Sequence, residues 1–187
     1  MKIIRTHDIK DFDIILVSSG SLLGNAIQDF TDSDINHVGI FVWLEGKLYV
    51  SEAERKGLQL VPFSEYVNNE KYKEFFLARL PHENISKEKK QNLKHFILKE
   101  TKNHSYDFMT LFIYQPIKQI SRKLFGKAIW LGKKDRKAKI RFVCSEWVAY
   151  IYNVFFAVFP KWYLTDPAEI KNSELFEIYK TKSQPVK

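Results

Sequence analysis

The sequence predicts an α+β domain in which a central antiparallel sheet packs against a buried helix that carries the only cysteine. Residues 37–44 (HVGIFVWL) and 47–53 (KLYVSEA) are strand-like runs joined by a Glu-Gly pair, which indicates a hairpin. Segment 144–159 (CSEWVAYIYNVFFAVF) is apolar on nearly every side of a helix, as is typical of a buried one. The chain of 187 residues is 45% hydrophobic and shows no repeat, so we expect a single domain over 1–187.

Three elements are expected before the hairpin. Residues 13–17 (DIILV) form a near-continuous apolar run rich in β-branched residues, which predicts a buried strand ending at 18–20. Ser21 can cap a helix over 22–30, where apolar residues recur at helical spacing. A polar loop over 31–36 then leads into the hairpin.

The hairpin turn sets the register of its two strands. If Glu45 and Gly46 are the central turn residues, positions whose numbers sum to about 91 face each other, because a two-residue turn fixes the pairing. Glu52 then lies opposite Gly39 and Glu54 opposite His37, and all four share one face of the sheet. An acidic side chain is therefore expected within reach of His37, directly across or diagonally.

The later elements follow from apolar periodicity and punctuation by proline, glycine and capping residues. In order, we expect a strand at 57–61, a short helix at 63–67, a strand at 75–80, a helix capped by Ser86, a loop at 103–107, an aromatic and basic stretch at 108–130 interrupted by Pro116 and Gly126, a charged loop at 133–139, a turn or short helix from 165–167 and a final strand at 175–179.

The positive charge is concentrated in a basic, aromatic and helical insertion at about 108–141. The net charge of the chain is +8, and residues 118–141 alone hold ten basic residues against one acid, Asp135, which gives +9. This segment could meet an anionic membrane surface or an acidic partner, or it could form helices packed on the core. Nucleic acid is an unlikely partner on this sequence, since no zinc-finger, RRM or KH pattern accompanies the charge.

The sequence also bears on the cellular location of the protein and on the metals or cofactors that it could bind. The N-terminal residues lack a signal-peptide pattern, and the longest apolar run, 154–160, is too short to span a bilayer, so we expect a cytoplasmic protein. One cysteine excludes an intrachain disulfide and a four-cysteine metal site. The five histidines (His7, His37, His82, His95 and His104) show no ligand spacing, and only His104 with Asp107 comes close, so neither a metal nor a cofactor is expected.

Three residue types could nevertheless carry chemistry. Cys144 lies in the first turn of its helix, where the macrodipole and open backbone N–H groups favour a thiolate. His37 can serve as its base, and Glu52 or Glu54 can accept the second ring proton. Each residue also has a structural alternative: a small buried thiol, a hydrogen-bonded strand histidine and solvated acids.

Four blocks of sequence resemble a known family. NHVGIFV, LYVSEA, FVCSEWVAYIY and the closing TDPAEIKNSELFEIY are similar to the permuted branch of the NlpC-type papain-like cysteine peptidases and amidases, the YiiX-like group. The resemblance implies a circularly permuted papain-like fold, with Cys144 as nucleophile, His37 as base and Glu52 as the third residue. It implies hydrolysis of a peptide or isopeptide amide through an acyl-enzyme.

The sequence departs from that family in three places. Asn36 stands where serine is commoner, Phe12-Asp13 replaces a Gly-Asp start, and the insertion at 108–141 is longer than usual. Two alternatives stay open: a lipid-directed acyltransferase or phospholipase of the lecithin–retinol acyltransferase type, and an inactive binding domain. The expected substrate is accordingly a peptide, another amide or a lipid ester.

Overall fold

A computed structural model describes residues 2–19, 33–54, 56–68, 72–81, 85–101, 105–106, 115–127 and 141–181. The helix expected at 22–30 and the charged loop expected at 133–139 lie outside these residues.

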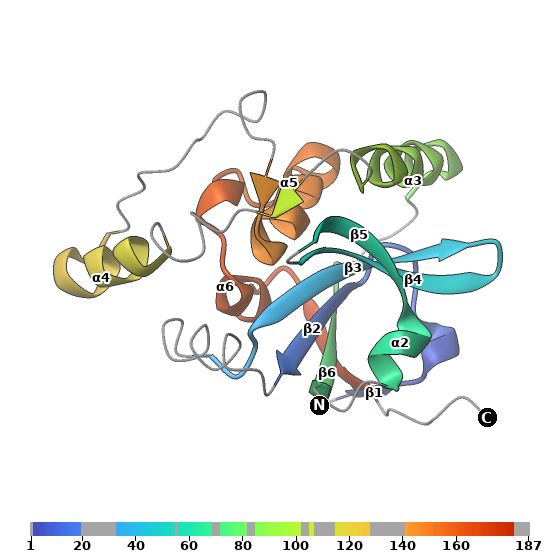
Figure 1. The fold of residues 1–187 in the computed structure, drawn as a ribbon, viewed down its shortest axis with the longest axis horizontal. Helices are drawn as coiled ribbons and strands as arrows, with labels where there is room; N and C mark the ends of the chain where they lie inside the picture. Colours follow the sequence, from blue (N-terminus) through green and yellow to red (C-terminus); the bar gives the residue numbers. More distant parts are fainter. Residues whose placement is uncertain are drawn as a thin grey trace.

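A seven-stranded sheet forms the centre of the molecule (Figure 1). Six neighbouring strands are antiparallel, as expected, and the short strand β1 adds a parallel pairing at one edge. The sequence does not predict β1, because three residues are too few to show the alternation of apolar and polar side chains that is typical of a strand. In spatial order the strands are β1 (Lys2–Ile4), β9 (Glu177–Thr181), β6 (Tyr72–Arg79), β2 (Ile14–Ser19), β3 (His37–Leu44), β4 (Lys47–Glu54) and β5 (Gly57–Pro62).

Both faces of the sheet are covered. Ile14 and Leu16 of β2 point into one core with helix α5 (Cys144–Phe156), while Ile15 and Val17 point into a second core with helix α2 (Phe63–Val67). Two buried faces explain why the strand reads as a continuous apolar run rather than an alternating one.

The remaining elements lie around the sheet and α5 (Figure 1). Helix α3 (Lys87–Thr101) stacks Phe96 on Trp147 of α5, and its first turn is capped by Ser86 as expected, since Lys89 N donates to Ser86 Oγ at 3.2 Å. Helix α4 (Gln115–Phe125) lies at one end of the molecule, beside α6 (Pro167–Lys171) (Figure 1). The other elements are the 3-10 turns η1 (Thr6–Asp8) and η4 (Trp162–Leu164), and a parallel pair of strands, β7 (Ser105–Tyr106) and β8 (Arg141–Phe142).

The register expected for the hairpin is confirmed. The pairs run from Leu44–Lys47 to Ile40–Ser51, and the numbers of each pair sum to 91. Glu45 (φ 48°) and Gly46 (φ 75°) both have positive φ, as a two-residue type I′ turn requires.

Several expected boundaries were wrong. Residues 105–106 of the expected 103–107 loop form strand β7, because they pair with β8. The helix expected over 144–159 ends at Phe156, since Ala157 adopts a left-handed conformation (φ 55°) and Pro160 follows. The final strand begins at Glu177, two residues later than expected. In the described part of the chain, no helix combines the length and the apolarity needed to cross a membrane.

Candidate active site

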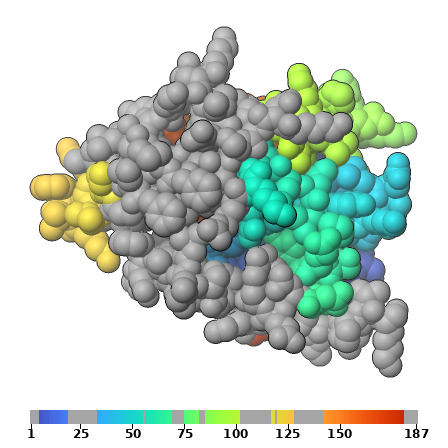
Figure 2. Space-filling model, in the orientation of Figure 1, coloured from blue at the N-terminus to red at the C-terminus, as the bar shows by residue number. Residues whose placement is uncertain are grey.

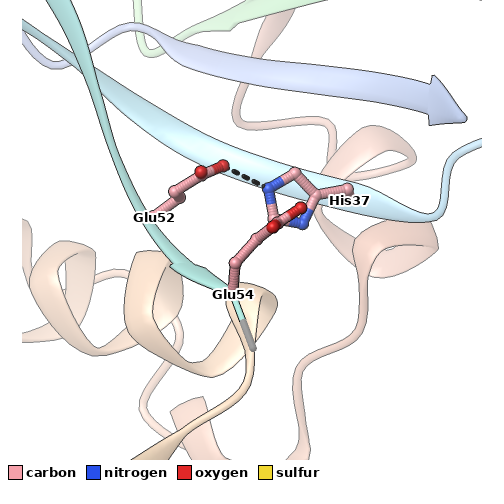
Figure 3. Close-up of side chains that lie close together, drawn as sticks. All are labelled: His37, Glu52 and Glu54. Carbon is pink, nitrogen blue, oxygen red and sulfur yellow. Dashed lines mark hydrogen bonds and ion pairs between the residues drawn. The ribbon is translucent and has the colours of Figure 1, made fainter. Parts of the chain in front are cut away.

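His37 and Glu52 meet in a buried hydrogen bond (Figure 3). Glu52 Oε2 lies 2.6 Å from His37 Nε2, and the two residues are 1% and 9% exposed. The contact joins the first residue of β3 to the paired strand β4 along the diagonal that the hairpin register allowed. The sequence left Glu52 and Glu54 as alternatives, and this bond runs to Glu52.

Gly39 permits the close approach of β3 and β4 beside this pair. A Cβ atom at Gly39 would lie 2.4 Å from Val50 Cγ1 and 3.1 Å from the Ser51 carbonyl oxygen. Real Cβ atoms do not approach backbone and branched side chains so closely, so any larger residue would push the strands apart. The glycine in the HVGI block therefore sets the spacing across which His37 reaches Glu52.

Two further side chains hold Glu52, and sequence reasoning missed both. Gln59 Nε2 donates to Glu52 Oε1 at 2.8 Å, and the Tyr66 hydroxyl donates to Glu52 Oε2 and lies 3.3 Å from His37 Nε2. Gln59 is directly opposite Glu52 in the β4–β5 ladder. The same register arithmetic applied to this second hairpin would have found Gln59. Tyr66 belongs to α2, and no local sequence pattern predicts that its hydroxyl contacts Glu52.

Cys144 is the first residue of α5 and is 6% exposed. Trp147 Nε1 donates to Ser51 Oγ at 3.0 Å, which fixes the first turn of α5 against β4 next to Glu52. Glu146 closes the turn, since Val143 N donates to Glu146 Oε2 at 3.2 Å. The leading N–H groups of a helix have no acceptor within the helix, and its dipole is positive there, so this end favours an anion.

His37 interacts with both the Glu52 carboxylate and the Cys144 side chain. Burial by itself lowers the pKa of His37, but the charge of Glu52 and the hydrogen bond and charge of Cys144 outweigh it. The pKa of His37 therefore lies well above its ordinary value of 6.5. Nε2 is turned toward Glu52, which leaves Nδ1 for a second partner of the ring. Such an imidazole can hold a proton between a sulfur and a carboxylate.

The same residues could also present ligands to a metal ion. One ligand atom each from His37, Glu52 and Glu54 lies within 4.8 Å of the others, and Figure 3 shows both carboxylates beside the ring. Spacing along the chain does not reveal this group, although the expected hairpin register places all three residues on one face. His104 and Asp107, the pair whose spacing came closest to that of metal ligands, lie outside the described residues.

Comparisons with known proteins indicate the family of the chain. A family model of permuted papain-like amidase enzymes, the YaeF/YiiX, C92 family, matches residues 8–119. That range contains His37, Glu52, Gln59 and Tyr66 and ends before Cys144.

Among solved structures, the chain is similar to the crystal structure of the metalloprotein yiiX from Escherichia coli O157:H7. The TM-score is 0.61 at 18% sequence identity, over 90% of this chain and 95% of the other. The two proteins therefore share a fold. No curated protein matches the sequence.

Proposed function

This chain belongs to the permuted papain-like amidase family, and on that premise we propose that it is a cysteine hydrolase that cleaves an amide bond. Cys144 is the nucleophile, His37 its base and Glu52 the residue that orients the histidine. The observation that carries the proposal is His37 itself, which contacts the Glu52 carboxylate at 2.6 Å and the Cys144 thiol from its buried position.

The reaction would proceed through an acyl-enzyme. The Cys144 thiolate attacks the carbonyl carbon, the C–N bond breaks, and the protonated His37 gives its proton to the leaving amine. Water then attacks the thioester, His37 takes the proton of that water, and the carboxylic acid leaves with the thiolate restored. Backbone N–H groups in the first turn of α5, including that of Cys144, are the expected donors to the oxyanion.

Glu52 acts on His37 and not on the substrate. Its two oxygens are occupied by Gln59, Tyr66 and His37, so the carboxylate cannot rotate without losing bonds. A fixed carboxylate fixes the imidazole plane and tautomer, which is the role of the third residue in such sites. Gln59 and Tyr66 are therefore positioning residues.

Trapping of the acyl-enzyme tests the proposal. The protein is mixed with peptide amides, isopeptides and N-acyl amino acids, with fatty-acyl esters as a separate arm, and its intact mass is followed. We expect an acyl adduct on Cys144 with an amide substrate, and none with Cys144→Ala. Adducts with lipid esters alone would favour the acyltransferase alternative. Reaction of Cys144 with iodoacetamide no faster than glutathione, with no adduct from any arm, would contradict hydrolysis and favour a binding domain.

A second candidate function is binding of a divalent cation, which the grouping of His37, Glu52 and Glu54 favours. The donor set fits, because an imidazole nitrogen and two carboxylates are ligands that zinc accepts, and the structural neighbour is described as a metalloprotein. A bound ion of this kind supplies Lewis acidity. His37 would then give its ring nitrogen to the ion and could not exchange protons with Cys144, so the two functions would exclude each other.

Glu54→Gln separates the two candidates, since Glu54 belongs to the ligand group but not to the proposed triad. We expect it to weaken zinc binding, measured by calorimetry, by about tenfold or more. Acylation of Cys144 in chelator-treated buffer should be unchanged. Wild-type protein that binds no zinc, or a variant that binds it equally well, would contradict the metal site and leave the hydrolase untouched.

A further inference from the structure

Helix α4 is amphipathic in the opposite sense to an ordinary surface helix. Lys118 and Ser121 are buried, whereas Ile120, Leu124 and Phe125 are 53%, 70% and 64% exposed. A surface helix of a globular protein normally turns its apolar side inward. Three of the five large hydrophobic side chains exposed in the described part of the chain lie on this one helix.

Ion pairs to α6 and its N-terminal turn hold α4 in this orientation. Lys118 Nζ lies 3.0 Å from Asp166 Oδ2 and also donates to the Leu164 carbonyl. One turn further on, Arg122 Nη2 donates to Glu169 Oε1 at 2.7 Å. Asp166 and Glu169 are themselves the capping box of α6. Rotating α4 to bury its apolar side would break these ion pairs. The outward apolar face is therefore a property of the fold.

Cations surround the exposed apolar face. Lys123 and Lys127 are exposed on and just after α4. A cavity of about 480 Å³ lies at the C-terminal end of the helix, where Arg122, Lys127 and Lys161 line it together with apolar residues. Its one acid, Glu169, is paired with Arg122. Residues 118–141 carry +9 in total, with ten basic residues against one acid.

We propose that α4 is a docking helix for an anionic phospholipid membrane. Ile120, Leu124 and Phe125 would enter the boundary between headgroups and acyl chains, while Lys123 and Lys127 meet the phosphates. A membrane fits better than a protein because α4, which carries these apolar side chains, lies at an outer edge of the molecule (Figure 2). Large apolar side chains beside Lys123 and Lys127, which pair with no acid in the described part of the chain, match the two-part chemistry of a lipid surface, whereas an acidic protein would satisfy only the cations.

Docking would also fix the position of the candidate active site relative to the membrane. Lys118 contacts the segment 164–166 through the Leu164 carbonyl and the Asp166 carboxylate. In the same segment, the Thr165 carbonyl accepts a hydrogen bond from Ser145 Oγ at 2.8 Å. Ser145 follows Cys144 in α5, so α4 and the cysteine are attached to one short segment. The docking inference itself does not depend on the proposed hydrolysis, because it concerns a different surface.

Vesicle flotation with the full chain tests the proposal. Vesicles of phosphatidylcholine and phosphatidylglycerol, three parts to one, are compared with pure phosphatidylcholine at low and high salt. We expect wild type to bind the anionic vesicles only, and less as salt rises. Leu124→Glu, and separately Lys123→Glu with Lys127→Glu, should each reduce the bound fraction about tenfold or more.

Matched substitutions elsewhere serve as controls. Leu175 is 51% exposed before β9, and Lys47 is exposed in the hairpin turn, so Leu175→Glu and Lys47→Glu should bind as wild type does. Circular dichroism shows that each variant remains folded. Absence of wild-type binding, equal loss in the Leu175 control, or a wild-type dimer in light scattering that Leu124→Glu dissociates would overturn the proposal, the last by assigning the face to a second copy.

Discussion

The region around His37 and the region around Lys118 both bury charged groups, but they use them differently. At His37, partners from β4, α2 and α5 contact an imidazole whose pKa Glu52 and Cys144 together raise. At Lys118, the partners come from η4 and α6 and fix the orientation of a helix whose apolar side faces outward. Both regions use a buried ion pair, which we propose takes part in catalysis at His37 and which fixes the orientation of a helix at Lys118. Changes in the first region should therefore alter reactivity, and changes in the second should alter stability and surface.

The largest effect is expected from His37→Ala. Removal of a general base and proton donor typically costs about 10²–10⁴-fold, so kcat/KM for the best amide substrate should fall by that amount. Leu124→Glu on α4 should leave turnover of the same soluble amide unchanged, because it touches none of the reacting groups. Equal losses in both variants would mean that the two regions are not functionally distinct.

Lys118→Met should produce the largest loss of stability among α4 substitutions. It leaves Asp166, which is 3% exposed, without its closest cation, and removal of one partner of a buried pair costs about 3 kcal/mol or more. Lys123→Met changes an exposed lysine on the same helix and should cost less than about 0.5 kcal/mol. Urea unfolding measures both values. Similar values for the two variants would show that the anchor does not stabilise α4.

The pH dependence of stability should reveal the proton on His37. Because the pKa of His37 is raised above 6.5 in the folded state, its contribution is fully present below about pH 6.5 and is lost as the pH rises through the raised value. The difference in unfolding free energy between wild type and His37→Gln should therefore shrink from pH 6 to pH 9. A wild-type advantage that grows with pH would contradict the protonated pair.

Much of the site followed from one turn. The Glu45-Gly46 pair fixed the register of β3 and β4, and the register placed an acid near His37. Cys144 was a candidate because it is the only cysteine and begins a helix, but only the resemblance connected it with His37, since nothing local links residue 144 to residue 37. Gln59 was accessible to the same arithmetic, whereas Tyr66 was not, because its contact depends on how α2 crosses the sheet.

The N-terminal part shows what pattern alone could not supply. Phe12 stands where the family commonly has glycine, and its backbone is left-handed (φ 72°), a conformation that glycine adopts without strain. The Phe12 ring is buried in the α5 core, and the Tyr152 hydroxyl donates to its carbonyl. The departure from the family is thus accommodated by packing that spans 140 residues of sequence. The outward face of α4 was likewise hidden, since an amphipathic pattern does not say which side is buried.

The smallest expected effect lies at the end of α5 remote from Cys144. Ala157 ends the helix in a left-handed conformation, and its N–H donates to the Asn153 carbonyl, as in the αL motif, at whose left-handed position glycine is favoured. Because Ala157 is exposed, Ala157→Gly removes backbone strain without opening a cavity and should stabilise the protein by about 1 kcal/mol. The same substitution at Ala149, buried within α5, should destabilise it by about 1 kcal/mol or more.

Alkylation of Cys144 should not change in Ala157→Gly, because the first turn of α5 is held by Ser51 and not by the far end of the helix. A stabilised variant with altered cysteine reactivity would show that the whole of α5, rather than its docking on β4, positions the thiol.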